Sequence, residues 1–144
     1  MKKKTYSLVY AGNKQRFARS VVVGDLVFVS GSSGRTLQTG EVASDDFKEQ
    51  MIVALDKIRA ALEEAGSSME HIVKTVIYMK RMEDYKVMRD TELDYFMTYA
   101  PGLIEEPPAS TVVQIVSLSR ANMLVEIDVT SAFHGRHIDF DEHV

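Results

Sequence analysis

Two segments near the C-terminus decide the fold: Pro107-Pro108-Ala109-Ser110-Thr111-Val112-Val113-Gln114-Ile115 and, after a short gap, Leu124-Val125-Glu126-Ile127-Asp128-Val129. Both are rich in the β-branched residues that favour strands. The turn-forming residues 119–122 between them predict a hairpin. The second strand carries a carboxylate, Glu126, among apolar residues. Burying it is costly unless a partner or a function requires it, so Glu126 is the first candidate site residue.

Strand signals also occupy the N-terminal part of the chain. Residues 6–10 predict a first strand, and residues 19–23 and 26–30 predict two more. Gly24-Asp25 separates the last two at the spacing of a two-residue hairpin, and this order of residues favours a type II′ turn. The Gly- and Ser-rich residues 31–35 predict a loop after the third strand.

Apolar residues at three- and four-residue steps predict a helix of about 20 residues over 47–65. Ser44 or Asp45 is expected to cap its N-terminus, and Gly66 is expected to end it in a left-handed conformation. Residues 72–79 then read as a strand.

Asp84 is expected to open a second helix that ends near Pro101. The resulting order predicts an α+β fold with a mixed sheet and two helices on one face. The other face would carry too many apolar residues for contact with water, so an oligomer is expected. The residues behind this expectation are Val21, Val23, Val27, Val29, Val113 and Ile115.

Composition limits the classes of protein. The chain has 144 residues, 45% hydrophobic and 26% charged, as expected for one globular domain, over 1–133, with a tail at 134–144. No apolar run predicts a membrane span, and no secretory signal is expected after the basic residues 2–4. The absence of cysteine is compatible with a cytoplasmic protein. The net charge of −4 makes nucleic acid an unlikely partner.

The tail contains histidines and acidic residues, including His134, His137 and His143. They show no ordered spacing of three ligands, so a solvated or packing tail is predicted and no metal site.

Several segments, in order and spacing, resemble the Rid family of reactive-intermediate deaminases: residues 27–31, 55–66, 72–85, the Pro108-Ala109 pair and the Glu126 strand. The resemblance covers roughly residues 19–133. It implies a chorismate-mutase-like fold and a homotrimer with a small-molecule metabolite bound at each subunit interface. It also implies hydrolysis of imines or enamines to a keto acid and ammonia, without metal or cofactor.

The resemblance also implies the roles of individual residues. Glu126 would handle the attacking water, and backbone groups near Gly31 and Val112 would contact the ligand. Rid proteins usually have an arginine at the position of Ser110, which clamps the substrate carboxylate. Losing one such charged hydrogen bond removes about 1.5–3 kcal/mol of binding, so a changed substrate preference is expected.

Another basic residue could replace the missing arginine. Arg89 is the preferred candidate, whereas Arg35 and Arg19 are weaker ones. The alternative for Arg89 is an exposed helix residue paired with Glu92 or Asp90. The substrate-binding residues are thus expected to be Phe17, Ser30, Gly31, Arg89, Ser110, Thr111 and Val112, with Glu126 as the catalytic residue.

Structural roles stay open for some of these residues. Glu126 can pair with a neighbouring subunit instead of acting on substrate, and Ser30-Gly31 can be a turn that needs small side chains. Three functions follow: an imine or enamine deaminase with altered preference, a non-catalytic trimer that binds a metabolite or stabilises a partner, and, least favoured by the acidic charge, an RNA-cleaving translation inhibitor.

Overall fold

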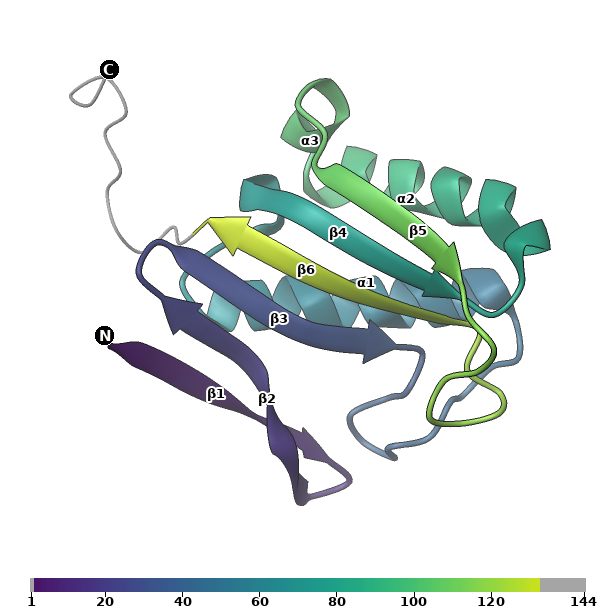
Figure 1. The fold of residues 1–144 in the computed structure, drawn as a ribbon, viewed down its shortest axis with the longest axis horizontal. Coiled ribbons are helices and arrows are strands. Elements are labelled where there is room, and N and C mark those ends of the chain that lie inside the picture. The colour runs from purple at the N-terminus through teal and green to yellow at the C-terminus, as the bar shows by residue number, and fades with distance from the viewer. Residues whose placement is uncertain (1, 133–144) are drawn as a thin grey trace.

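The computed structural model describes residues 2–132, which form one six-stranded sheet with helices against one face (Figure 1). The predicted tail at 134–144 lies outside the described residues. The strands are β1 (Lys3–Tyr10), β2 (Asn13–Val23), β3 (Leu26–Ser33), β4 (Ile72–Met79), β5 (Ala109–Gln114) and β6 (Val125–Ala132). The helices are α1 (Phe47–Glu64), α2 (Tyr85–Tyr99) and the short α3 (Gly102–Glu105), with 3₁₀ turns η1 (Met69–His71) and η2 (Met82–Asp84).

The sheet has the order β1-β2-β3-β6-β4-β5. Only β4 and β5 pair in parallel; the other neighbours are antiparallel. The predicted mixed α+β sheet is therefore confirmed. The predicted hairpin of the last two strands is wrong, because β4 lies between β5 and β6. Parallel strands need a crossover, which α2 supplies between β4 and β5, and the loop at 115–124 is long enough to pass β4.

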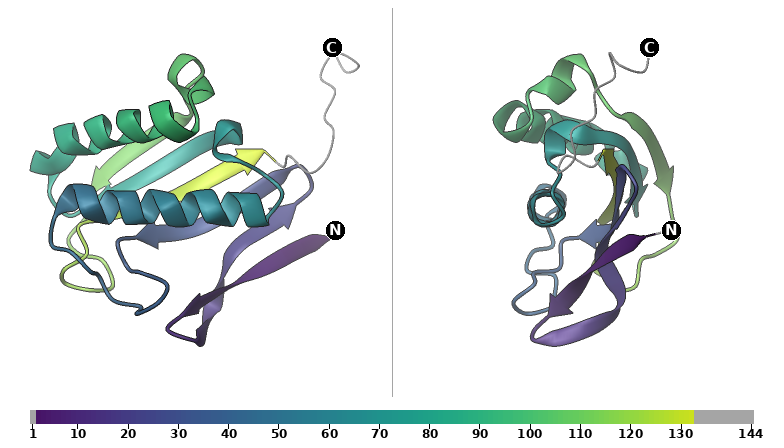
Figure 2. Two further views of the ribbon diagram at one scale, coloured as in Figure 1. Left: turned by 180° about the vertical axis from the view of Figure 1, so that it is seen from behind. Right: turned by 90° about the vertical axis from the view of Figure 1, so that its left-hand side faces the viewer.

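Helices α1 and α2 cover one face of the sheet and leave the other face open (Figure 2). The N-cap of helix α1 is Asp46, one residue after Asp45 and two after Ser44, the two predicted caps. The side chain of Asp46 accepts the Glu49 N–H at 3.0 Å, while the Ser44 hydroxyl accepts the Asp46 N–H at 3.0 Å. Gly66 ends the helix as expected, with φ +83°.

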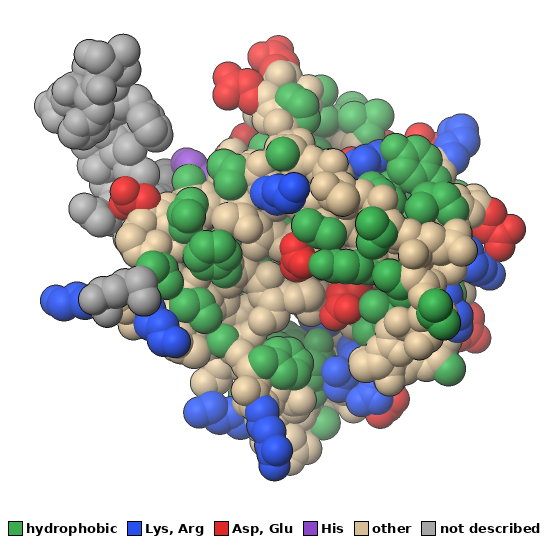
Figure 3. All heavy atoms as spheres, in the orientation of Figure 1, with side chains coloured by type: hydrophobic (Ala, Val, Ile, Leu, Met, Phe, Trp, Pro, Cys, Tyr) green, Lys and Arg blue, Asp and Glu red, His purple; other side chains and the backbone are tan. Residues whose placement is uncertain are grey.

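The apolar residues that suggested an oligomer do not all lie on the same face of the sheet. Val27 and Val29 are buried against α1 and form part of the core, so placing them on the uncovered face was wrong. The alternation along β3 puts Leu26 and Phe28 on the open face instead, 41% and 45% exposed. Hydrophobic side chains are therefore spread over this face (Figure 3).

Several strands extend further than expected, and two of these extensions change the surroundings of predicted site residues. Strand β2 starts at Asn13, so Phe17 lies within a strand. Strand β3 runs to Ser33, so residues 31–33 are not a loop, although the ladder with β6 is irregular between Val29 and Ser32. In the described part of the chain, no helix is long and apolar enough to cross a bilayer.

Candidate functional site

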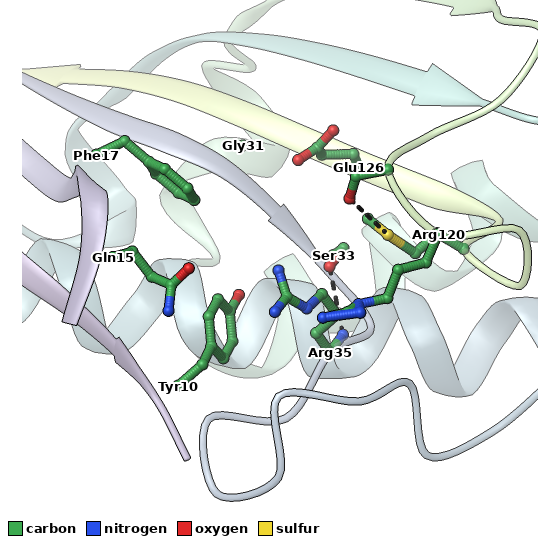
Figure 4. A pocket seen from close by; sticks show the side chains of 10 residues that line it. Tyr10, Gln15, Phe17, Gly31, Ser33, Arg35, Arg120 and Glu126 are labelled. Carbon is green, nitrogen blue, oxygen red and sulfur yellow. Dashed lines mark hydrogen bonds between the residues drawn. The ribbon is translucent and has the colours of Figure 1, made fainter. Parts of the chain in front are cut away.

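The open side of the sheet borders a cavity of about 470 Å³ (Figure 4). Its walls come from segments far apart in the sequence: Tyr10 and Phe17 from β1 and β2, Gly31 from β3, Arg35 from the loop after it, and Arg120 and Glu126 from the end of the chain. Three predicted site residues, Phe17, Gly31 and Glu126, are thus brought together.

The side chain of Glu126 packs against Gly31. A Cβ atom at position 31 would come within 2.7 Å of Glu126 Oε1 and 2.8 Å of Cδ, closer than real contacts allow. Glycine is therefore required at this position by the carboxylate beside it. The irregular register of β3 and β6 at this point is typical of a bulge that redirects a side chain next to a site.

The Glu126 carboxylate has no partner among the residues that the structure describes. It is half-buried, and within residues 2–132 no side chain donates a hydrogen bond to it or forms an ion pair with it. Burial raises the pKa of Glu126 above its ordinary value; the charge of Lys57 opposes the rise, Asp128 adds to it and Arg35 opposes it. A raised pKa makes this carboxylate a stronger base than an ordinary glutamate, as suits a group that takes and returns a proton.

A buried lysine stands behind the cavity wall. Lys57 of α1 is 9% exposed, and its Nζ donates a hydrogen bond of 2.9 Å to the Tyr10 hydroxyl. Burial lowers the pKa of Lys57 to about 8. This residue was not predicted as part of the site. A signal existed, because Lys57 follows the buried Gln50 by seven residues and so shares the helix stripe that faces the sheet.

Two guanidinium groups approach the same space as Glu126 (Figure 4). Arg35 lies 4.0 Å over the Tyr10 ring, and its Nε donates to Gly40 O at 2.8 Å. Arg120 comes from the loop between β5 and β6. Arg35 was predicted only as a weaker replacement for the missing arginine, and Arg120 was not predicted at all.

Arg89 and Ser110 meet at a different place, beside a smaller cavity of about 200 Å³. Arg89 Nη2 donates to Ser110 Oγ at 3.2 Å, so a guanidinium does fill the space in front of the serine. The remaining donors are also engaged: Nε bonds Tyr85 Oη at 3.1 Å and Nη1 bonds Glu92 Oε1 at 2.9 Å. The proposed alternative, a pair with Glu92, is therefore present as well.

The two groups of residues lie on opposite faces of the sheet. Ser110 pairs with Thr75, which is buried on the helix side. Glu126 pairs with Tyr78, three residues further along β4 and hence on the open side. One copy of the chain therefore does not bring Arg89 or Ser110 to Glu126.

The other predicted residues line neither cavity. The Ser30 hydroxyl donates to Ala18 O at 2.6 Å, Thr111 Oγ1 accepts from Lys74 Nζ at 3.4 Å, and Val112 packs against the core. Arg19, the third candidate replacement, contacts Lys57 O at 3.4 Å and Glu64 at 3.7 Å. The part of the chain that the structure describes contains no group of three or more metal-ligating side chains.

Comparison with known proteins agrees with this geometry. The family model described as Endoribonuclease L-PSP matches residues 11–133. The chain belongs to this family, the Rid family. A Rid-family protein of unknown function from Yersinia pestis has the same fold, with a TM-score of 0.79 at 23% identity, covering 91% of this chain and 99% of that one.

Relatives by sequence cover most of the domain. A RutC family protein from Pyrococcus abyssi is 31% identical over 112 residues, 78% of this chain and 82% of that protein. A protein of Dermatophagoides farinae named 2-iminobutanoate/2-iminopropanoate deaminase is 24% identical over 106 residues, 71% of this chain and 83% of that protein.

Proposed function

We propose that this Rid-family protein hydrolyses small imine or enamine metabolites to a carbonyl compound and ammonia. The observation that carries the proposal is the Glu126 carboxylate: half-buried, without a partner in the described chain, and facing a cavity of about 470 Å³. A relative named for imine deamination supports it.

Glu126 would act as a proton shuttle. Its carboxylate takes a proton from water as the water oxygen forms a bond to the imine carbon, and the C=N electron pair moves to nitrogen, which is protonated. The resulting carbinolamine then loses ammonia: Glu126 moves the hydroxyl proton to the amine nitrogen, the C=O bond forms, and the C–N bond breaks with its electron pair going to nitrogen. An imine carbon is already electrophilic, so positioning and proton transfer are the main requirements.

The complete site would include a second copy of the chain. In the proposed homotrimer, a neighbouring subunit brings its Arg89 and Ser110 to the cavity around Glu126. Two features support this arrangement: the apolar residues exposed on the open face, and the separation of the predicted site residues into two groups on opposite faces.

The preferred substrate would differ from simple 2-imino carboxylates. Ser110 is neutral, and all three donor nitrogens of Arg89 already have acceptors in their own chain. A carboxylate bound there would compete with the negative charge of Glu92 for the Arg89 guanidinium. We therefore expect slow hydrolysis of 2-iminopropanoate and faster hydrolysis of other imines.

The test is the release of carbonyl product from a panel of imines made in place, 2-imino carboxylates by an amino acid oxidase and imines without a carboxylate by an amine oxidase. Wild-type protein should accelerate release from at least one imine, and Glu126→Gln should reduce that rate by about 100-fold or more. Glu63→Gln is the matched control, since Glu63 is an exposed glutamate of α1 that does not line the cavity. Acceleration that survives in Glu126→Gln would contradict the proposal.

A second candidate is a non-catalytic trimer that binds a metabolite. The fully engaged Arg89 guanidinium favours it, because that group resembles a structural contact more than a free clamp. Glu126→Ala separates the two: loss of turnover with unchanged melting and assembly supports the enzyme, whereas loss of stability or of the trimer supports a structural role.

A further inference from the structure

The cavity that holds Glu126 contains more positive charge than the carboxylate neutralises. Two arginines, Arg35 and Arg120, line it together with the single acidic residue. Within residues 2–132, Arg35 has no acidic partner. Its guanidinium is instead fixed by non-acidic groups, the Tyr10 ring and the carbonyl of Gly40.

The neighbouring residues Tyr10 and Gly40 hold the Arg35 side chain in one orientation. Gly40 has φ +74°, and a Cβ there would lie 3.4 Å from Tyr10 Cβ and 3.8 Å from Arg35 Nη2. The Nε donor is used by Gly40 O, while neither Nη group is needed to hold the side chain. An arginine oriented in this way keeps two parallel donors for a planar or tetrahedral anion.

Arg120 supplies an independent observation. Its Nε atom is out of contact with solvent and has no hydrogen-bond acceptor in the described chain. A buried donor without an acceptor is costly, and such a group commonly marks a missing water or ligand. Its one acidic neighbour, Glu41, lies 3.8 Å from Nη1 with a side chain 67% exposed, which is a weak surface pair.

The loop that carries Arg120 is also anchored. Gln50 of α1 is 1% exposed, and its Nε2 donates to Asn122 O at 2.9 Å while its Oε1 accepts the Leu124 N–H at 2.9 Å. This buried amide holds the loop against α1, so the position of Arg120 is fixed before a ligand arrives.

We propose that Arg35 and Arg120 form an anion-binding subsite, so that the ligand carries a carboxylate or phosphate group bound between them while its reactive end faces Glu126. The assignment of a reactive end rests on the proposed function; the anion subsite does not. The substrate class would then be imines or enamines with an acidic group other than a 2-carboxylate, bound from the side of the cavity formed by this chain itself.

The experiment measures binding of succinate and of inorganic phosphate by calorimetry and thermal shift. It uses the full chain with Glu126→Gln in the background, so that turnover plays no part. Binding of either probe, weakened about tenfold or more by Arg35→Gln and by Arg120→Gln, is the expected result. Stronger binding of succinate identifies a carboxylate ligand, and stronger binding of phosphate identifies a phosphate ester; both support the subsite.

Arg81→Gln is the control, because Arg81 is paired with Asp84 on the surface and lines none of the cavity. If Arg35→Gln lowers the melting temperature, the conclusion is drawn from Arg120→Gln instead. The Arg120 side chain is 34% exposed, so its replacement should disturb the fold less. No binding of either probe, or equal binding by all variants, overturns the subsite.

The two proposals fail separately. Imine hydrolysis that depends on Glu126, combined with unchanged anion binding in Arg35→Gln, would remove the subsite and leave the deaminase. Anion binding that depends on both arginines, with no acceleration of any imine, would remove the deaminase and leave the subsite.

Discussion

The Glu126 cavity and the Arg89–Ser110 cluster are built from similar side chains but differ in how their charges are used. Every donor nitrogen of Arg89 has an acceptor in the chain. By contrast, neither Glu126 nor Arg35 forms an ion pair within residues 2–132, and Arg120 keeps an unused buried donor. Satisfied charges stabilise a structure, whereas unsatisfied charges around a cavity are available to a ligand.

The first and largest test of this contrast is Gly31→Ala. The added Cβ would come within 2.7 Å of Glu126 Oε1 and must displace the carboxylate. Because a displacement of about 1 Å at a reacting group can cost roughly 100-fold in rate, imine hydrolysis should fall by that order while melting changes little. The same substitution made in Glu126→Gln should cause no further loss; an equal additional loss would show that Gly31 acts independently of Glu126.

A smaller effect is expected from Lys57→Met. The pKa of Lys57 is about 8 in the folded protein, against 10.5 ordinarily, because burial disfavours its charge. The folded state therefore holds this proton less tightly, and wild-type stability should rise as pH rises from about 8 to 10.5. At pH 7 the variant should be more stable by about 2 kcal/mol, allowing for the lost hydrogen bond to Tyr10.

Urea unfolding at pH 7 and pH 10 measures this difference. The advantage of Lys57→Met should shrink at pH 10, where the wild-type lysine is neutral when folded. Lys48→Met, an exposed lysine of the same helix, is the control and should show no such dependence. An equal difference at both pH values would contradict the account of a charged, buried lysine.

The smallest effect is expected from Arg89→Gln. Its ion pair with Glu92 is partly exposed, and pairs of this kind contribute about 0–1 kcal/mol. Unfolding should therefore change by less than about 1 kcal/mol, and imine hydrolysis by less than about tenfold, since the guanidinium is already engaged. A loss of turnover as large as that of Glu126→Gln would show that Arg89, not the Glu126 cavity, dominates substrate recognition.

Much of the fold could be predicted from the sequence because its signals are local. The apolar periodicity of 47–65 and the β-branched runs identified the helix and the strands. The partner of β6 could not be predicted in this way. The spacing from 115 to 124 fits a hairpin, and only the crossover through α2 shows that β4 occupies the place beside β6.

The candidate site, too, was predictable only where its signals are local in the sequence. Glu126 stands out as a carboxylate in an apolar strand, so sequence alone identified it. Arg35 and Arg120 are 85 positions apart and come together only because β3 and β6 are neighbours in the sheet. The pair of Arg89 with Glu92 was expected from the three-residue spacing on a helix, whereas its bond to Ser110 depends on how α2 packs beside β5.

The most direct test of the central claim is the pH dependence of kcat/KM for imine hydrolysis, corrected for the uncatalysed rate. If the half-buried Glu126 carboxylate takes the proton from water, activity should fall on acidification with a midpoint above 4.5, the ordinary pKa of glutamic acid, because burial raises the pKa of Glu126. The residual activity of Glu126→Gln should lack this acid limb. Activity that stays constant down to pH 4.5, or an identical limb in Glu126→Gln, would contradict the account.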